Sequence, residues 1–348
     1  MRALADGEFR TETTYLNTAS YGLPPQRGLT AVQDVLREWS AGRATPADQD
    51  DRVDVLRDRF AALLSGATAA DVAVGSSVGA LIGPVAAGLP AGAEVLVAEG
   101  DFASVPNPFR YRGDLRVRSV PLAELVDRVR PGTALVAVSL TQSADGRTVD
   151  RAALRAATHA HGARLLYDAT QAAGWLPLTF ADADYWVCAT FKWLLGARSV
   201  SLLAAAPEAA ADLRPVGPGW YAAQDRWTEI YAPERLADTT RRFDDTPDWL
   251  GVVAAVAGLD VVHETTVDAI HAHDLALATR FRKGLTDLDL TPVPGDSPIV
   301  AIPGAASAND RLAAAGVIAS ARAGGLRFSF HLHNTAEDVD RALDVLAR

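Results

Sequence analysis

From Asp71 onward, short apolar runs alternate with helical patterns of about ten residues. The runs predict strands at 71–75, 93–100, 133–141, 163–170, 183–190 and 199–205, and the patterns between them predict helices at 80–87, 122–130 and 151–162. This alternation is typical of an α/β domain with three layers and a mostly parallel sheet. Because such sheets bind ligands beyond the carboxyl ends of their strands, the residues that follow each strand are the first candidates for a site.

The pattern changes after Ala205, where a segment rich in Pro and Gly leads to a long apolar helix that we expect to begin at Thr246 and Pro247. The remaining chain predicts helices at 276–285, 308–316 and 335–347 and strands at 298–303 and 325–332. Asn334, three residues before Glu337, has the spacing of a helix N-cap in a capping box. We therefore expect an N-terminal segment near the site (1–20), a large domain (21–245) and a small α+β domain (246–348).

Composition excludes several classes of protein. With 49% hydrophobic and 22% charged residues, this chain of 348 residues has the composition of a globular protein. Its net charge of -10 predicts no nucleic-acid or anionic membrane partner. No segment reads as a signal peptide or a membrane span, so we expect a cytoplasmic protein. Cys188 is the only cysteine, so no internal disulfide or multi-cysteine metal site can form; its strand context predicts an inert, buried thiol.

Polar side chains follow two consecutive predicted strands. Asp168 closes the strand LLYD, Gln171 comes three residues later, and Lys192 follows YWVCAT between two aromatic residues. Partial desolvation would lower the pKa of this lysine and make its amine nucleophilic. Taken alone, the lysine could lie over aromatic surface and the aspartate could stabilise a turn. Together they form the pair that pyridoxal 5'-phosphate requires, a lysine for the imine and an acid for the pyridine nitrogen.

Four segments carry a resemblance to a known family. They are YLNTASYG, DATQAAG, FKWLLGAR and LRFSFHLHNTAEDVD, in that order along the chain. The chain resembles the class V aminotransferases, which are fold-type-I pyridoxal phosphate enzymes and include cysteine desulfurases, kynureninases and isopenicillin-N-epimerase-like proteins. The resemblance implies a large αβα domain with a small C-terminal domain, an amino-acid substrate and a homodimer.

The resemblance also implies roles for individual residues. Lys192 would hold the cofactor as a Schiff base and later move the substrate proton, and Asp168 would bind the pyridine nitrogen. Gln171 would approach the cofactor oxygen O3', Phe102 would stack on the ring, and Thr190 would bind the phosphate.

Other residues are expected around the phosphate. Ser76 and Ser77 lie in a small-residue turn between a strand and a helix, where backbone N–H groups and hydroxyls can bind a phosphate. By the resemblance, Thr246 would donate to the phosphate of the neighbouring protomer, although Asp245 replaces the glycine that usually precedes it.

Three residues are candidates for the substrate side. Arg327 has the planar fork that matches the α-carboxylate of an amino acid. Asn17, in the opening loop, would assist it, and Gln142 would contact O3' or the substrate.

Several reactions remain open for such a site. A persulfide-forming desulfurase needs a loop cysteine, and the stretch VIASARAGGLRFS has none. We therefore favour a lyase that releases a thiol from a cysteine conjugate by β-elimination, followed by an aminotransferase. An epimerase, with His331 or His333 as a second proton donor, comes third. A binding protein without catalysis would be expected to lack the lysine, the aspartate or the arginine, and all three are present.

Overall fold

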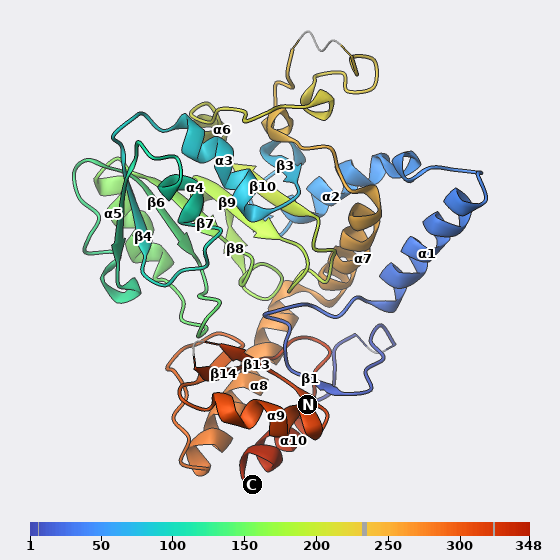
Figure 1. The fold of residues 1–348 in the computed structure, drawn as a ribbon, viewed down its shortest axis with the longest axis vertical. Coiled ribbons are helices and arrows are strands. Elements are labelled where there is room, and N and C mark those ends of the chain that lie inside the picture. The colour runs from blue at the N-terminus through green and yellow to red at the C-terminus, as the bar shows by residue number, and fades with distance from the viewer. Residues whose placement is uncertain (6, 232–234, 323) are drawn as a thin grey trace.

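The computed structural model describes residues 1–348 except 6, 232–234 and 323. Its centre is a seven-stranded sheet in the order β3-β10-β9-β7-β6-β4-β5 (Figure 1). The strands are β3 (Val72–Gly75), β4 (Glu94–Ala98), β5 (Arg116–Val120), β6 (Thr133–Ser139), β7 (Arg164–Asp168), β9 (Tyr185–Ala189) and β10 (Ser201–Ala205). Only β10 runs antiparallel to its neighbours. The predicted α/β class is therefore confirmed.

Helices cover both faces of this sheet because its strands are apolar on both sides. Alternate residues of β4 enter different cores: Leu96 packs in one, and Val95 and Val97 pack in the other. The first core contains side chains of α2 (Asp51–Ala61), α5 (Arg151–Ala160) and α7 (Trp249–Thr265). The second contains side chains of α3 (Val78–Gly88), α4 (Asn107–Arg110) and α6 (Pro207–Ala210). Helix α1 (Gln26–Ser40) packs against α7.

The C-terminal part has a core of its own. It consists of α8 (Val267–Asp287), β11 (Ile299–Ile302), α9 (Asn309–Ala314), β12 (Val317–Ile318), β13 (Ser320–Arg322), β14 (Gly325–Ser329) and α10 (Ala336–Leu346). Strands β11, β14 and β13 form an antiparallel sheet. The N-terminal strand β1 (Thr14–Tyr15) pairs in parallel with β12, so the start of the chain lies beside this part (Figure 1). A short pair of β2 (Leu64–Ser65) and β8 (Leu178–Thr179) completes the strands.

The division into 1–20, 21–245 and 246–348 stays a prediction. Helix α7 packs against α1 and α2, and an 83° bend separates it from α8. We therefore propose that the small domain begins near Thr266. No single described helix is long and apolar enough to cross a membrane; the bent pair α7 and α8 reaches that length and composition only when taken together.

Three local predictions were wrong. The segment 122–130 forms only a 3₁₀ turn at Leu122–Glu124. The prolines at 121 and 131 leave too few residues between them for helical hydrogen bonds to offset the free-energy cost of nucleation. Helix α7 begins at Trp249 with Asp248 as N-cap, since Pro247 disfavours helical backbone at the residue before it.

The last helix is capped one residue later than predicted. Thr335 is the N-cap of α10, and its backbone N–H donates to the Asp338 carboxylate at 2.8 Å in a capping box. Asn334 instead donates to the carbonyl of Tyr15 at 2.9 Å and so ties β1 to the start of this helix.

Candidate active site

Two adjoining cavities lie at the carboxyl ends of the parallel strands. The first has a volume of about 210 Å³ and includes residues from the ends of β3, β6, β7 and β9. The second, of about 360 Å³, includes the N-terminal loop and two arginines of the small domain. The residues that line both are Phe102, Ser143, Phe191, Lys192 and Arg198. Lys192 therefore lies where the two cavities meet.

The amine of Lys192 is held in an apolar setting. Its Nζ lies 5.5 Å from the ring centroids of both Phe102 and Phe191, and the residue is 7% exposed. Burial lowers the pKa of Lys192 to about 8, although the negative charge of Asp168 opposes this shift. About a tenth of the amine is therefore neutral, and thus nucleophilic, at pH 7, far more than for a lysine in water.

Asp168 ends β7 and lines the first cavity. Its Oδ1 accepts a hydrogen bond of 2.8 Å from the backbone N–H of Thr170, whose hydroxyl accepts another from the N–H of Ala189. Burial raises the pKa of Asp168, while Thr170 and the charge of Lys192 act against that rise. A cation inside the cavity would compensate the cost of this buried carboxylate.

Gln171 joins three parts of the site. Its Oε1 accepts a bond of 2.8 Å from the indole of Trp193, and its Nε2 donates to the carbonyl of Ala19 and to the hydroxyl of Ser143. Both amide protons are thus engaged. Gln171 lines the first cavity, and contact with a cofactor oxygen there stays a prediction.

Small hydroxyl residues line the first cavity near the start of α3. Ser77 is the N-cap of α3, and its Oγ accepts from the N–H of Ala80 at 3.2 Å, so its own proton can be donated elsewhere. Ser76 lies beside it, and both serines line the cavity, whereas their binding of a phosphate stays a prediction. Ser201 also lines it, and its buried Oγ has no hydrogen-bond partner among the described residues.

Arg327 lines the second cavity from β14 and is 2% exposed. Its Nη1 donates to the carbonyl and hydroxyl of Ser143, and its Nη2 donates to Ser20 and Ser320. Among the described residues it forms no ion pair with an acid. Burial, and secondarily the charge of Arg322, lowers the pKa of Arg327 to about 10. A buried guanidinium without a counter-charge favours an anionic ligand.

Four predicted residues do not line either cavity. The hydroxyl of Thr190 donates to the carbonyls of Ala197 and Val200, which holds the loop after Lys192 and leaves no proton for a phosphate. Gln142 is buried and donates to the carbonyl of Ser139 at 3.1 Å.

The other two of these residues are Asn17 and Thr246. Asn17 contributes its backbone, whose carbonyl accepts from the N–H groups of Ser20 and Tyr21 and so turns that loop into the second cavity. Thr246 is exposed, and its role toward a neighbouring protomer stays a prediction.

Phe102 lines both cavities and is 53% exposed, which leaves a face available for stacking.

Sequence reasoning missed several residues of the site. Each lies within six residues of a predicted one along the chain, and they are Ser20, Tyr21, Ser143, Thr170, Arg198 and Arg322. Thr170 stands inside the quoted turn DATQ, and Arg198 ends the quoted segment FKWLLGAR. Arg322 carried no such signal, because only the pairing of β13 with β14 brings it to Arg327.

The remaining titratable candidates lie outside the cavities. His331 is buried, with its Nδ1 2.9 Å from Asp274 and its Nε2 3.1 Å from the carbonyl of Trp193. Burial, and then the charge of His331, lowers the pKa of His333 to about 3. Cys188 is buried in β9, and burial raises the pKa of its thiol, as expected for an inert cysteine.

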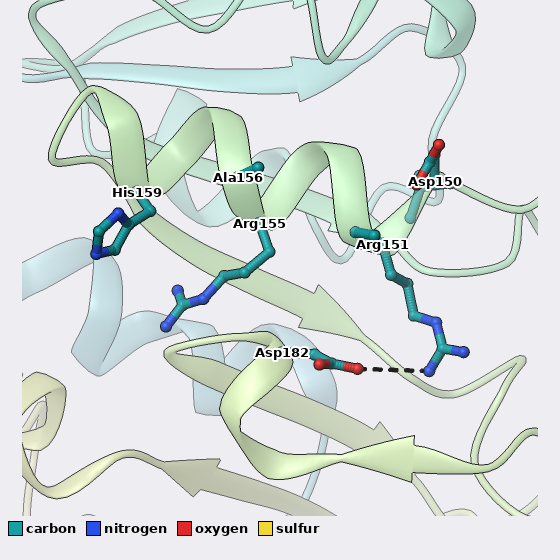
Figure 2. A pocket seen from close by; sticks show the side chains of 8 residues that line it. Asp150, Arg151, Arg155, Ala156, His159 and Asp182 are labelled. Carbon is teal, nitrogen blue, oxygen red and sulfur yellow. Dashed lines mark ion pairs between the residues drawn. The ribbon is translucent and has the colours of Figure 1, made fainter.

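A larger, more open depression lies along α5, away from these cavities (Figure 2). Arg151 pairs with Asp182 at 3.5 Å across the depression (Figure 2), and Arg155 pairs at 2.8 Å with Asp184, which lies outside its lining. Asp150 caps the helix by accepting from the N–H of Ala153. Since both arginines that line it are already paired with acids, this depression offers an anionic ligand no unpaired arginine among the described residues.

The first cavity fits pyridoxal 5'-phosphate. A buried carboxylate and a desolvated lysine line the same space, the serines at the start of α3 supply donors, and the Ser201 hydroxyl has no partner among the described residues. These are the donor types that a protonated pyridine, an aldehyde and a phosphate require.

Comparisons with known proteins show the family and the fold of this chain. The family model for class V aminotransferases matches residues 57–307. An uncharacterized aminotransferase, YcbU, of Bacillus subtilis is 27% identical over 85% of this chain and 84% of its own, and a kynureninase of Deinococcus radiodurans is 28% identical over 80% and 72%. The structure of the cystine C–S lyase C-DES has a TM-score of 0.87 at 20% identity, covering 97% of this chain and 98% of that one. This chain is a member of the class V aminotransferase family, pyridoxal phosphate-dependent enzymes of fold type I.

Proposed function

We propose that this chain binds pyridoxal 5'-phosphate at Lys192 and cleaves the C–S bond of a cysteine conjugate by β-elimination. The observation that carries the proposal is the position of Lys192, which lines both the cavity that holds Asp168 and the cavity that holds Arg327. One amine can thus hold the cofactor and reach a substrate. In the net reaction a cysteine conjugate and water yield a thiol, pyruvate and ammonium.

When bound, the cofactor supplies an electron sink for the charge that develops at the substrate α-carbon. Asp168 would hold the proton of the pyridine nitrogen, and Phe102 would cover the ring. Arg327 binds the α-carboxylate and orients the α-proton toward Lys192, whose neutral amine removes it. The thiolate then departs without help from a second nucleophile.

The buried position of Cys188 in β9 supports a lyase over a persulfide-forming desulfurase, since the chain has no other cysteine. An epimerase is less favoured because neither His331 nor His333 is among the described residues that line the cavities. An aminotransferase remains the second candidate, favoured by the likeness to YcbU. We further propose a cytoplasmic homodimer.

The test of the cofactor uses the small number of lysines in the chain. Only Lys192 and the exposed Lys283 are present. Borohydride reduction of the purified protein followed by peptide mass spectrometry should place the phosphopyridoxyl group on Lys192. A Lys283→Ala variant should retain the visible absorbance of the cofactor, and a Lys192→Ala variant that still forms the reducible bond would refute the assignment.

The test of the reaction is a screen of L-cysteine conjugates. We expect pyruvate, ammonium and a thiol in equal amounts without any keto acid. A strict requirement for a keto-acid acceptor would instead identify an aminotransferase.

A further inference from the structure

The second cavity is strongly positive, although the chain as a whole carries a net charge of -10. Besides Lys192 it is lined by Arg198, Arg322 and Arg327, and no Asp or Glu is among the described residues that line it. None of the three arginines forms an ion pair within the described part of the chain. A cleft lined by one sign of charge concentrates ligands of the opposite sign.

Two of these arginines are held side by side. Arg322 of β13 and Arg327 of β14 lie on paired strands, and the Nη2 atoms of both donate to one hydroxyl, that of Ser20, at 3.5 and 2.6 Å. Two like charges at one oxygen repel each other, and no acid intervenes among the described residues. An anion bound between or beside them would relieve that repulsion.

The third arginine, Arg198, is held by aromatic side chains at the mouth of the cavity. Its guanidinium carbon lies 5.6 Å from the ring of Tyr21 and 5.4 Å from the ring of Phe191, and its Nη1 donates to the Tyr21 hydroxyl. Stacking on two rings orients Arg198 although it is exposed. Its charge adds to the positive potential at the entrance.

One α-carboxylate compensates only one of these charges. Arg327 is the most buried of the three and is already assigned to that group. We infer that the substrate carries a second anionic group, which Arg322 binds beside the α-carboxylate with Arg198 adding positive charge at the entrance. This inference rests on the proposed function: the substrate is then a cysteine conjugate whose sulfur substituent bears a carboxylate or an equivalent anion.

A matched pair of substrates tests the inference on the holoenzyme. S-carboxymethyl-L-cysteine and S-carbamoylmethyl-L-cysteine have nearly the same shape and differ by the negative charge of one group. We expect kcat/KM, measured as pyruvate release, to favour the acid by about tenfold or more, the range of a charge-assisted hydrogen bond. The preference should weaken as KCl is raised, because salt screens an exposed charge.

Variants locate the preference. Arg322→Gln should lower the ratio of kcat/KM for the acid over the amide by about tenfold. Arg128→Gln, which removes an exposed arginine paired with Glu124, is the matched control and should leave the ratio unchanged. Equal kcat/KM for the two conjugates in the parent enzyme, or an unchanged ratio in Arg322→Gln, would overturn the inference.

Failure of the proposed reaction is distinguishable from failure of this inference. If neither conjugate yields pyruvate, β-elimination is wrong, and the dissociation constants of the two compounds with the holoenzyme then decide the question by calorimetry. Tighter binding of the acid that is lost in Arg322→Gln supports the anionic site. Equal dissociation constants refute it.

Discussion

The indole Nε1 of Trp193 donates a hydrogen bond of 2.8 Å to Oε1 of Gln171. Gln171 lies in the turn that follows Asp168, the last residue of β7, and Trp193 lies next to Lys192 in the segment after β9. The bond therefore joins these two segments. The carboxylate and the amine that would hold the cofactor at two points are therefore fixed relative to each other by a side-chain contact as well as by the sheet. Gln171 is a positioning residue in this arrangement.

Trp193→Phe should lower the free energy of unfolding of the apoprotein by about 1–3 kcal/mol or more, because it leaves a buried amide oxygen unpaired and opens a cavity. Urea unfolding measures the loss. Trp227→Phe is the control, since the Trp227 indole donates to Asp50 at 2.8 Å from a half-exposed position. Equal losses in the two variants would contradict the importance of the buried bond.

The reaction of the apoprotein with pyridoxal 5'-phosphate should depend on pH through Lys192. Only the neutral amine is nucleophilic, and its pKa is lowered to about 8, so the rate should rise with pH and level off above that value. Between pH 6 and pH 9 the neutral fraction increases roughly 100-fold. Stopped-flow absorbance measures the rate.

Two variants check the cause of that profile. Asp168→Asn removes a negative charge that raises the pKa of Lys192, so the midpoint should move to lower pH. Arg327→Gln removes a positive charge that lowers it, so the midpoint should move to higher pH. Shifts in the opposite directions would refute the electrostatic account.

Arg327→Gln should also raise KM for every α-amino acid substrate, by roughly 10- to 100-fold, with a smaller effect on kcat. The reason is that the guanidinium binds a carboxylate that is present in both the ground state and the transition state. Steady-state kinetics with Arg128→Gln as control measures this. An unchanged KM would remove Arg327 from the substrate site.

The buried ion pair between Arg57 and Asp244 supports β3, the strand that leads into the turn with Ser76 and Ser77. Arg57 Nη2 lies 2.6 Å from Asp244, whose Oδ1 also accepts from the N–H of Val74 in β3. Asp244→Ala should therefore lower the free energy of unfolding by about 3–5 kcal/mol, because it strands a buried guanidinium. Asp245→Ala, at the exposed neighbour, should change it by less than about 0.5 kcal/mol.

The predicted role of Thr246 requires a dimer. Sedimentation should show a dimer, and Thr246→Val should weaken cofactor binding by about tenfold, the loss of one hydrogen bond to a charged group. A mixed dimer of Thr246→Val and Lys192→Ala chains should recover one site of full affinity, because the intact threonine then serves the intact lysine. A monomeric active enzyme would exclude the contact.

The sequence alone determined the α/β class. It also placed the candidate lysine, aspartate and serines at the ends of apolar strands, because the period and length of such strands are local properties. It could not separate Thr190, which binds its own loop, from Thr170, which supports Asp168; both are threonines near strand ends. Nearby prolines decided that the segment 122–130 forms no α-helix and that α7 begins at Trp249. The periodicity of apolar residues alone does not show this effect.

Only the tertiary structure brought Arg322, Arg327 and Ser20 to one place. Ser20 and Arg327 are separated by 307 positions, and they meet because the N-terminal loop folds back beside β14. Side chains that converge from distant segments have no signature in a linear pattern, since their contact depends on strand pairing rather than on spacing. The residues proposed to bind the cofactor thus had a local signal in the sequence, whereas the positive charge of the second cavity was decided by the packing of the small domain and the N-terminal loop against the sheet.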